Sequence, residues 1–168
     1  MGEKPGPVAP EPMTEPIPHI LFVCLGNICR SPMAEGLARR RFADAGIAAA
    51  FDSAGIGDWH AGAPPDRRAV NACWKALVDL SAQRARQIEP ADFERFDHIV
   101  AMDAENVAEL VAMAPPGHAA KISRILDFAA LEEADVPDPY YGGHEGFDEV
   151  LGLIDAGLAG LMRHVGGG

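Results

Sequence analysis

The stretch HILFVCLGNICRSPMAEG, residues 19–36, decides the fold. Its first five residues form a short continuous apolar run, as in a strand that is buried on both faces. A helix is expected from Ser31 to about Ala45, because Ser31 can cap it and Pro32 suits its first turn. The strand would pass into this helix through the loop at 24–30. The stretch therefore predicts a strand–loop–helix unit.

The rest of the chain continues this alternation of strands and helices. Further strands are expected at 47–53, 98–102 and 121–125. After a loop at 58–65, a helix is expected that ends at about 75–80, followed by one helical turn at 90–96. Two further helices are expected, one capped by Asp103 and running to about Met113 and one at 145–165. Strands that alternate with helices indicate parallel βαβ units and an α/β sheet. Ligands bind beyond the carboxyl ends of such strands, so chemistry is expected in the loop after the first strand.

Composition narrows the class of protein and its partners. The chain has 168 residues, 48% of them hydrophobic and 23% charged, and a formal net charge of −11. This acidity argues against nucleic acid, whose phosphates require a basic surface. No run approaches the ~20 apolar residues of a membrane span, and the first residues lack the apolar core of a secretory signal. Three cysteines are too few for a disulfide framework, so free thiols and a cytoplasmic protein are expected.

The composition also predicts the domain organisation. Residues 1–18 contain six prolines and little aliphatic bulk, which is typical of a disordered tail. One folded domain is expected at 19–165, a length that suits a single hydrophobic core. A short glycine tail at 166–168 would follow it.

The loop after the first strand has the residue types of an anion site. A loop that curls before a helix can point backbone N–H groups inward, and the helix dipole adds positive potential. Such a hollow stabilises both a phosphate and the thiolate of Cys24, while Arg30 supplies a planar fork for two phosphate oxygens. Ser31 can donate its hydroxyl proton to the thiolate. The other residues expected to bind phosphate are Leu25, Gly26, Asn27, Ile28 and Cys29, of which Gly26 and Asn27 accept left-handed backbone angles.

Two other kinds of site fit this loop less well. Cys24 and Cys29 could suggest zinc, but no second ligand pair with suitable spacing follows, so no metal is expected. Neither glycine pattern of a nucleotide-binding loop is present, so no cofactor is expected. Asp138, between Pro137 and Pro139, is a candidate acid on a stiff loop, although an aspartate beside proline is also a common turn residue.

Two motifs together resemble one known family. VCLGNICRSPMAEG (23–36) and DPYYG (138–142) are similar to segments of the low-molecular-weight protein tyrosine phosphatases. The similarity also includes segments DSAGIGDWHAGAPPDRRAV (52–70), ARQI (85–88) and IVAMD (99–103). It extends over essentially residues 19–165. The fold that it implies is a three-layer α/β, flavodoxin-like arrangement, with a four-stranded parallel sheet flanked by helices.

The resemblance implies a role for each matching residue. Cys24 matches the nucleophile, Arg30 the phosphate-binding arginine and Asp138 the general acid. Further matches are Asn27 to the residue that braces the loop, Ser31 to the hydrogen-bond donor of the nucleophile, Trp59 and Tyr140 to the aromatic walls, and Cys29 to a cysteine that can form a reversible disulfide with the nucleophile. The activity implied is hydrolysis of phosphotyrosine and aryl phosphates through a phosphocysteine, without a cofactor. The implied partners are phosphate or another oxyanion in the site and a phosphotyrosine protein, with a bacterial tyrosine kinase as one candidate.

One departure and two alternatives remain at this point. Gln83 stands where many members have a histidine that helps hold the loop asparagine. An arsenate reductase would use the same loop but needs two further redox cysteines, and only Cys73 is left. A phosphotyrosine-binding regulatory domain would keep the loop but lose the nucleophile or the acid, and both are present.

Overall fold

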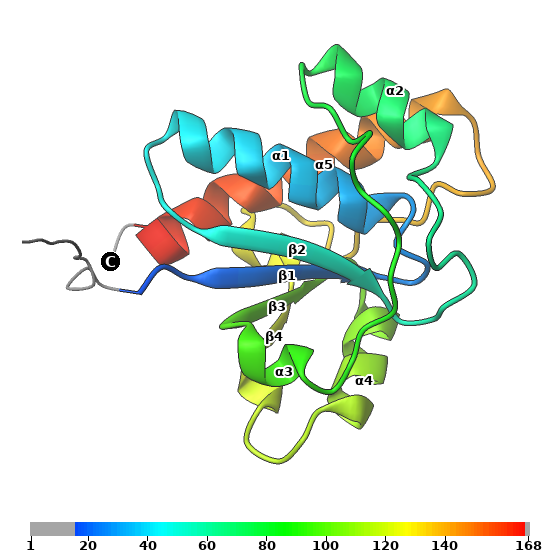
Figure 1. Ribbon diagram of the computed structural model, residues 1–168. Coiled ribbons are helices and arrows are strands. Elements are labelled where there is room, and N and C mark those ends of the chain that lie inside the picture. Colours follow the sequence, from blue (N-terminus) through cyan, green and yellow to red (C-terminus); the bar gives the residue numbers. More distant parts are fainter. Residues whose placement is uncertain (1–15, 167–168) are drawn as a thin grey trace, which may run out of the picture.

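The computed structural model describes residues 16–166, and within them the chain builds one parallel sheet. Its strands are β1 (His19–Cys24), β2 (Ala50–Gly55), β3 (His98–Ala101) and β4 (Ile122–Arg124). They lie in the order β2-β1-β3-β4, and every neighbouring pair is parallel (Figure 1). Most of the tail expected at 1–18, and residues 167–168 of the glycine tail, lie outside the described residues.

Helices cover both faces of the sheet, as Figure 1 shows. One face carries α1 (Arg30–Asp44), α2 (Arg67–Lys75) and α5 (His144–Gly166). The opposite face carries α3 (Asp92–Arg95) and α4 (Ala104–Met113). The short helices η3 (Ala119–Lys121) and η4 (Ile125–Phe128) flank β4. This arrangement confirms the three-layer α/β fold that the sequence predicts.

Strand β1 supplies both halves of the hydrophobic core, because its side chains alternate between the two faces. Phe22 points to the face covered by α1 and α5, where it belongs to the same buried cluster as Met33 and Phe147. Val23 points to the other face and belongs to the cluster that includes Phe93. With both faces covered, β1 is buried from its second residue onward. The continuous apolar run in the sequence therefore indicates a central parallel strand.

One predicted strand boundary is wrong, and backbone geometry explains it. Strand β2 begins at Ala50 rather than at 47, because Gly46 adopts a left-handed φ of 73° and the N–H of Ile47 still bonds to the end of α1. Helix α2 ends at Lys75, the first residue of the range expected for its end, because Leu77 adopts a φ of 65°. A left-handed residue is a common helix terminator, but leucine rarely occupies that position.

The predicted cap of the first long helix is also wrong. Helix α1 begins at Arg30, and Cys29 at its cap position makes no side-chain capping bond. Ser31 lies inside the first turn and is fully buried, so its hydroxyl is available to the loop instead. By contrast, Asp103 caps α4 as expected: its Oδ1 accepts the Asn106 N–H at 2.8 Å.

Candidate active site

The loop at 24–30 lies at the carboxyl edge of the sheet, between β1 and α1. In the strand order β2-β1-β3-β4, β1 connects to β2 on one side while β3 lies on its other side, which makes the β1–β3 boundary the position where such sheets bind ligands. Within the loop, Asn27 has a φ of 60°, which confirms the left-handed conformation expected there. Gly26 does not share it. Its lack of a side chain serves a close approach instead, since a Cβ there would lie 2.9 Å from Cδ2 of His60.

Asn27 braces the loop through every polar atom of its side chain. Its Nδ2 donates to Ser31 Oγ at 2.7 Å and to Ser53 Oγ at 3.0 Å. Its Oδ1 accepts the backbone N–H of Arg86 at 2.9 Å. These bonds tie the loop to α1, to β2 and to the segment that follows α2. The bracing role that the resemblance implied therefore has a full set of partners in the structure.

The directions of these bonds determine where the hydroxyl proton of Ser31 points. Ser53 Oγ donates its hydroxyl hydrogen to the buried Glu35 Oε1 at 2.7 Å, so in its contact with Asn27 it is the hydrogen-bond acceptor. Ser31 Oγ likewise accepts from Asn27, and its other neighbour is Cys24 Sγ at 3.0 Å. When Cys24 is a thiolate, which can only accept, the hydroxyl proton of Ser31 is therefore directed at the sulfur. The backbone N–H of Ser31 also faces that sulfur, at 3.4 Å. Both groups stabilise a thiolate more than a thiol.

Arg30 is held rigidly from behind, with one edge of its guanidinium turned to the loop. The side chain is 3% exposed, and Nη1 donates to Asp103 Oδ2 at 2.6 Å and to the Val136 carbonyl at 2.9 Å. Burial alone would lower the pKa of Arg30, but the negative charges of Cys24, Asp103 and Asp138 outweigh it and raise that pKa. The guanidinium therefore stays charged, and Nη2, which lies 3.7 Å from Asp138 Oδ2 but donates no hydrogen bond among the described residues, can bind an oxyanion.

Asp103 is a site residue whose second role the sequence analysis missed. It was expected only to cap a helix, whereas its other oxygen fixes Arg30. A signal was available, since Asp103 follows β3 and the carboxyl ends of neighbouring parallel strands meet at one edge of the sheet.

Asp138 lies beside Arg30 although more than a hundred residues separate them. Its Oδ2 is 3.7 Å from Arg30 Nη2, and its Oδ1 accepts the Tyr140 N–H at 3.1 Å. The aspartate therefore shapes its own turn and also presents its carboxyl to the nucleophile loop. The turn role weighed in the sequence analysis is therefore observed, and the carboxyl lies beside the loop where a general acid would be needed.

Cys24, Arg30 and Asp138 line one pocket of about 330 Å³. Its lining consists of Cys24, Leu25, Gly26, Ile28, Cys29, Arg30, Trp59, His60, Asp138, Tyr140 and Tyr141. Trp59 and Tyr140 flank the opening, in positions that suit aromatic walls. His60 and Tyr141 were not predicted to line the site; the His60 and Tyr140 ring centroids lie 6.2 Å apart. Asn27 and Ser31 support the pocket from behind.

The three cysteines occupy different environments, and none forms a disulfide in the structure. Burial, followed by the nearby charges of Asp66, Cys24 and Asp138, raises the pKa of the Cys29 thiol well above its ordinary value. Burial also raises the pKa of Cys73 to about 12. Both therefore remain protonated at neutral pH, while Cys24 has the two hydrogen-bond donors described above. Within residues 16–166, no three His, Cys, Asp or Glu side chains are grouped so as to hold a metal ion.

Comparison with known proteins agrees with this geometry. Residues 19–167 match the model of the family described as low molecular weight phosphotyrosine protein phosphatase. The low molecular weight protein-tyrosine-phosphatase YfkJ of Bacillus subtilis is 44% identical over 149 residues, which cover 87% of this chain and 94% of that one. A low molecular weight phosphotyrosine protein phosphatase of Schizosaccharomyces pombe is 42% identical over 142 residues, which cover 82% of this chain and 90% of that one.

Solved structures agree as well. The crystal structure of YfkJ superposes with a TM-score of 0.86 at 41% identity and covers 91% of this chain and 97% of that one. A protein tyrosine phosphatase from Entamoeba histolytica with Hepes in its active site gives 0.85 at 34% identity, covering 89% and 98%. By sequence, by fold and by the match over 19–167, this chain belongs to the low molecular weight phosphotyrosine protein phosphatase family.

Proposed function

We propose that the protein-tyrosine-phosphatase activity of this family is carried out here by Cys24, Arg30 and Asp138. The observation that carries the proposal is that Cys24 and Arg30, from the loop at 24–30, and Asp138, from the segment before α5, line one pocket. In the first step the Cys24 thiolate attacks phosphorus, and the bond from phosphorus to the phenolic oxygen breaks. Arg30 and the loop bind the phosphoryl oxygens during the transfer.

Asp138 completes both steps of the reaction. As an acid, its carboxyl protonates the departing phenolate, a group whose conjugate acid has a pKa of ~10. As the carboxylate, it then takes a proton from the water that attacks the phosphocysteine and releases phosphate. The hydroxyl of Ser31, directed at Cys24 Sγ, stabilises the thiolate that leaves in this second step.

Two substitutions test these roles. Cys24→Ser should abolish turnover of p-nitrophenyl phosphate while inorganic phosphate still binds, because the loop and Arg30 remain. Asp138→Asn should slow phenyl phosphate far more than p-nitrophenyl phosphate, whose leaving group needs less protonation. Wild-type turnover by the serine variant would overturn the nucleophile assignment, and equal slowing of both substrates would overturn the acid assignment.

The pocket supports phosphotyrosine proteins as substrates, and a bacterial tyrosine kinase is the proposed specific partner. A related Vibrio vulnificus Wzb structure, 26% identical, is in complex with benzylphosphonate, an aryl group with a phosphate-like head. A cytoplasmic location is proposed on the three free thiols. Within the described residues, no helix is long and apolar enough to cross a membrane.

Reduction of arsenate has less support as a second function. It requires further cysteines that exchange a disulfide with the nucleophile, and such thiols must be accessible. Cys73 lies on α2 with its side chain fully buried in the core, and it remains a protonated thiol. Cys29 is the remaining thiol near the pocket.

A further inference from the structure

Arg68, the second residue of α2, makes bonds that neither the motif nor the mechanism above uses. Its Nη1 donates to the Gly142 carbonyl at 2.7 Å, and its Nη2 donates to the Tyr140 carbonyl at 2.9 Å. Its guanidinium also lies over the aromatic rings of Tyr140, at 5.7 Å, and Phe147, at 4.6 Å. Figure 1 shows the segment before α5 approaching α2 at this point. The arginine thus holds the loop that carries Asp138.

The other edge of Arg68 is fixed by Asp66. Arg68 Nε donates to Asp66 Oδ1 at 3.0 Å, Nη2 contacts Asp66 Oδ2 at 3.0 Å, and the Arg68 N–H donates to Asp66 Oδ1 at 2.8 Å. Asp66 in turn donates its own backbone N–H to the Ile28 carbonyl, in the nucleophile loop, at 2.8 Å. The pair therefore connects the loop that carries Cys24 with the loop that carries Asp138.

The hold on the acid loop reaches Asp138 through one residue. The N–H of Tyr140 donates to Asp138 Oδ1, and the carbonyl of the same Tyr140 accepts from Arg68. Tyr140 is thus fixed at both its polar backbone groups, one of which sets the orientation of the carboxyl. Only a planar fork can donate to two carbonyls and to a carboxylate at once; a lysine ammonium cannot span these acceptors.

We infer that Arg68 is a positioning residue for the general acid, which sets the distance and direction of the Asp138 carboxyl relative to the phosphate bound over Cys24. The inference rests on the proposed function, because positioning has meaning only if Asp138 transfers the proton. Arg68 does not line the phosphate pocket, so it acts on the acid loop and leaves phosphate binding to Arg30.

Arg68→Ala and Arg68→Lys test this role, with Arg67→Ala as the matched control. Arg67 precedes Arg68 on α2, is exposed, and has no side-chain bond within the part of the chain that the structure describes. With phenyl phosphate, kcat/KM, which covers only the transfer of the phosphoryl group to Cys24, should fall at least ~10-fold in both Arg68 variants, as part of the ~10²–10⁴ that a general acid contributes. With p-nitrophenyl phosphate, kcat/KM should change by less than about threefold, and the inhibition constant of inorganic phosphate should stay within about twofold.

The background of Asp138→Asn separates positioning from a general structural effect. In that background Arg68→Ala should change kcat/KM for phenyl phosphate by less than about twofold, because there is no acid left to position. Equal slowing of both substrates, or full additivity with Asp138→Asn, would overturn the inference. Cys24→Ser separates a failure of the proposed function from a failure of the inference about Arg68. If Cys24→Ser remains active, the proposed function itself is wrong. If Cys24→Ser is inactive but Arg68→Ala keeps the leaving-group dependence of the wild type, only the positioning role is overturned.

Discussion

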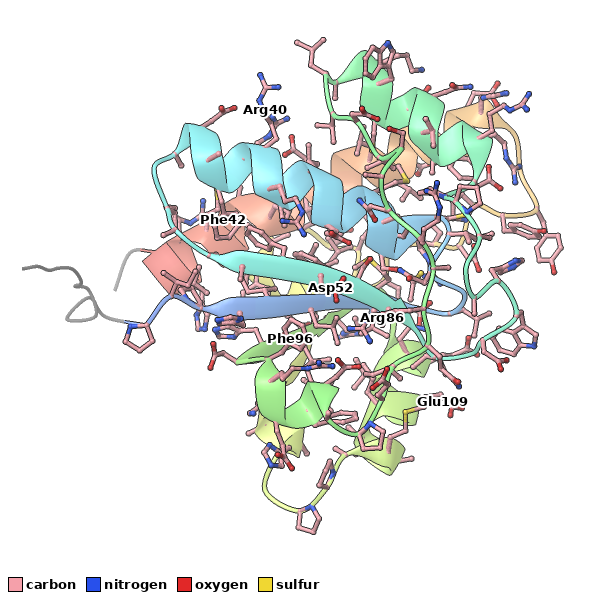
Figure 2. All side chains as sticks on the ribbon, viewed as in Figure 1. Arg40, Phe42, Asp52, Arg86, Phe96 and Glu109 are labelled. Carbon is pink, nitrogen blue, oxygen red and sulfur yellow. The ribbon has the colours of Figure 1, made fainter. Side chains whose placement is uncertain are left out.

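Asp92 offers a test of what stabilises the nucleophile loop from behind. Its side chain is 0% exposed, yet it accepts Arg86 Nη1 at 2.9 Å, Arg86 Nη2 at 3.0 Å, Arg95 Nη2 at 2.7 Å and the Glu89 N–H at 2.7 Å. The backbone N–H of Arg86 donates to Asn27, and the Arg86 side chain donates from Nε to Asp52 at 3.2 Å. Figure 2 shows Arg86 beside Asp52. The carboxylate therefore anchors the segment that braces the loop.

Asp92→Asn changes the charge and leaves the size almost unaltered. Breaking a buried ion pair costs ~3–5 kcal/mol when the remaining partner stays buried. Here the partner side chains are 27% and 58% exposed, for Arg86 and Arg95, so both can turn toward water. The expected loss in the free energy of unfolding is therefore at the lower end, about 3 kcal/mol at pH 7.

The loss should depend on pH in one direction. Burial alone would raise the pKa of Asp92, but the bonds from Arg86, Glu89 and Arg95 outweigh it and lower that pKa. A carboxyl with a lowered folded pKa adds stability above its unfolded value of ~3.9, and this stability is lost as pH falls through the folded value. The difference between wild type and variant should be constant from pH 7 to 5 and should then shrink by up to ~1.4 kcal/mol per pH unit below about pH 4.

Urea unfolding at pH 7, 5, 4 and 3.5 measures this difference. Asp58→Asn is the matched control, since Asp58 is exposed and no ion pair of its side chain occurs among the described residues. The control should lose little stability at any pH. A loss below about 1 kcal/mol at pH 7, or a loss just as large at pH 3.5, would refute the reasoning, because a buried ionised carboxylate must show both effects.

Three further substitutions address the site and the packing behind it. Arg30→Lys keeps the charge but not the fork, so kcat/KM for p-nitrophenyl phosphate should fall at least ~100-fold; near-wild-type activity would contradict bidentate binding. Cys29→Ser should make peroxide inactivation harder to reverse with dithiothreitol if Cys29 captures the oxidised Cys24 as a disulfide, and equal recovery would argue against that switch. Gly160→Ala would bring a Cβ into collision with the Phe128 carbonyl of η4 and should cost ~1–3 kcal/mol in urea unfolding, whereas Gly152→Ala, with open space around it, should stabilise the helix.

The fold was predictable because each element carried a local signal. A continuous apolar run in β1 and the residues around Cys24 are sufficient to place the loop at the edge of a parallel sheet. The exact ends of the helices could not be predicted where a residue adopts a conformation or makes a contact that its type does not indicate. Leu77, in a left-handed conformation, ends α2. Ser31 does not cap α1, because its hydroxyl contacts Cys24 Sγ in the loop instead.

The candidate site was predictable only in part, for a related reason. Residues of the motif can be recognised in the sequence by their type and spacing. The residues that hold them in place can be recognised only from the folded structure. Asp103 fixes Arg30 from the end of a different strand, and Arg68 reaches the acid loop from α2. An arginine in a helix is ordinarily a solvated residue, so its sequence context contains no sign of two carbonyl partners more than seventy residues away.

Gln83 shows how the loop keeps its bracing without the histidine that the family resemblance leads us to expect there. Its Nε2 donates to the Pro32 carbonyl at 3.0 Å, and its buried Oε1 has no partner within the described residues, so it makes no bond to Asn27. Asn27 instead receives its support from Ser53, which Glu35 orients, and from the backbone of Arg86. A group that titrates near neutral pH is therefore not needed at position 83 to hold the loop. Replacing Gln83 should then disturb the first turn of α1 more than the nucleophile, since Pro32 loses its donor while every bond of Asn27 remains.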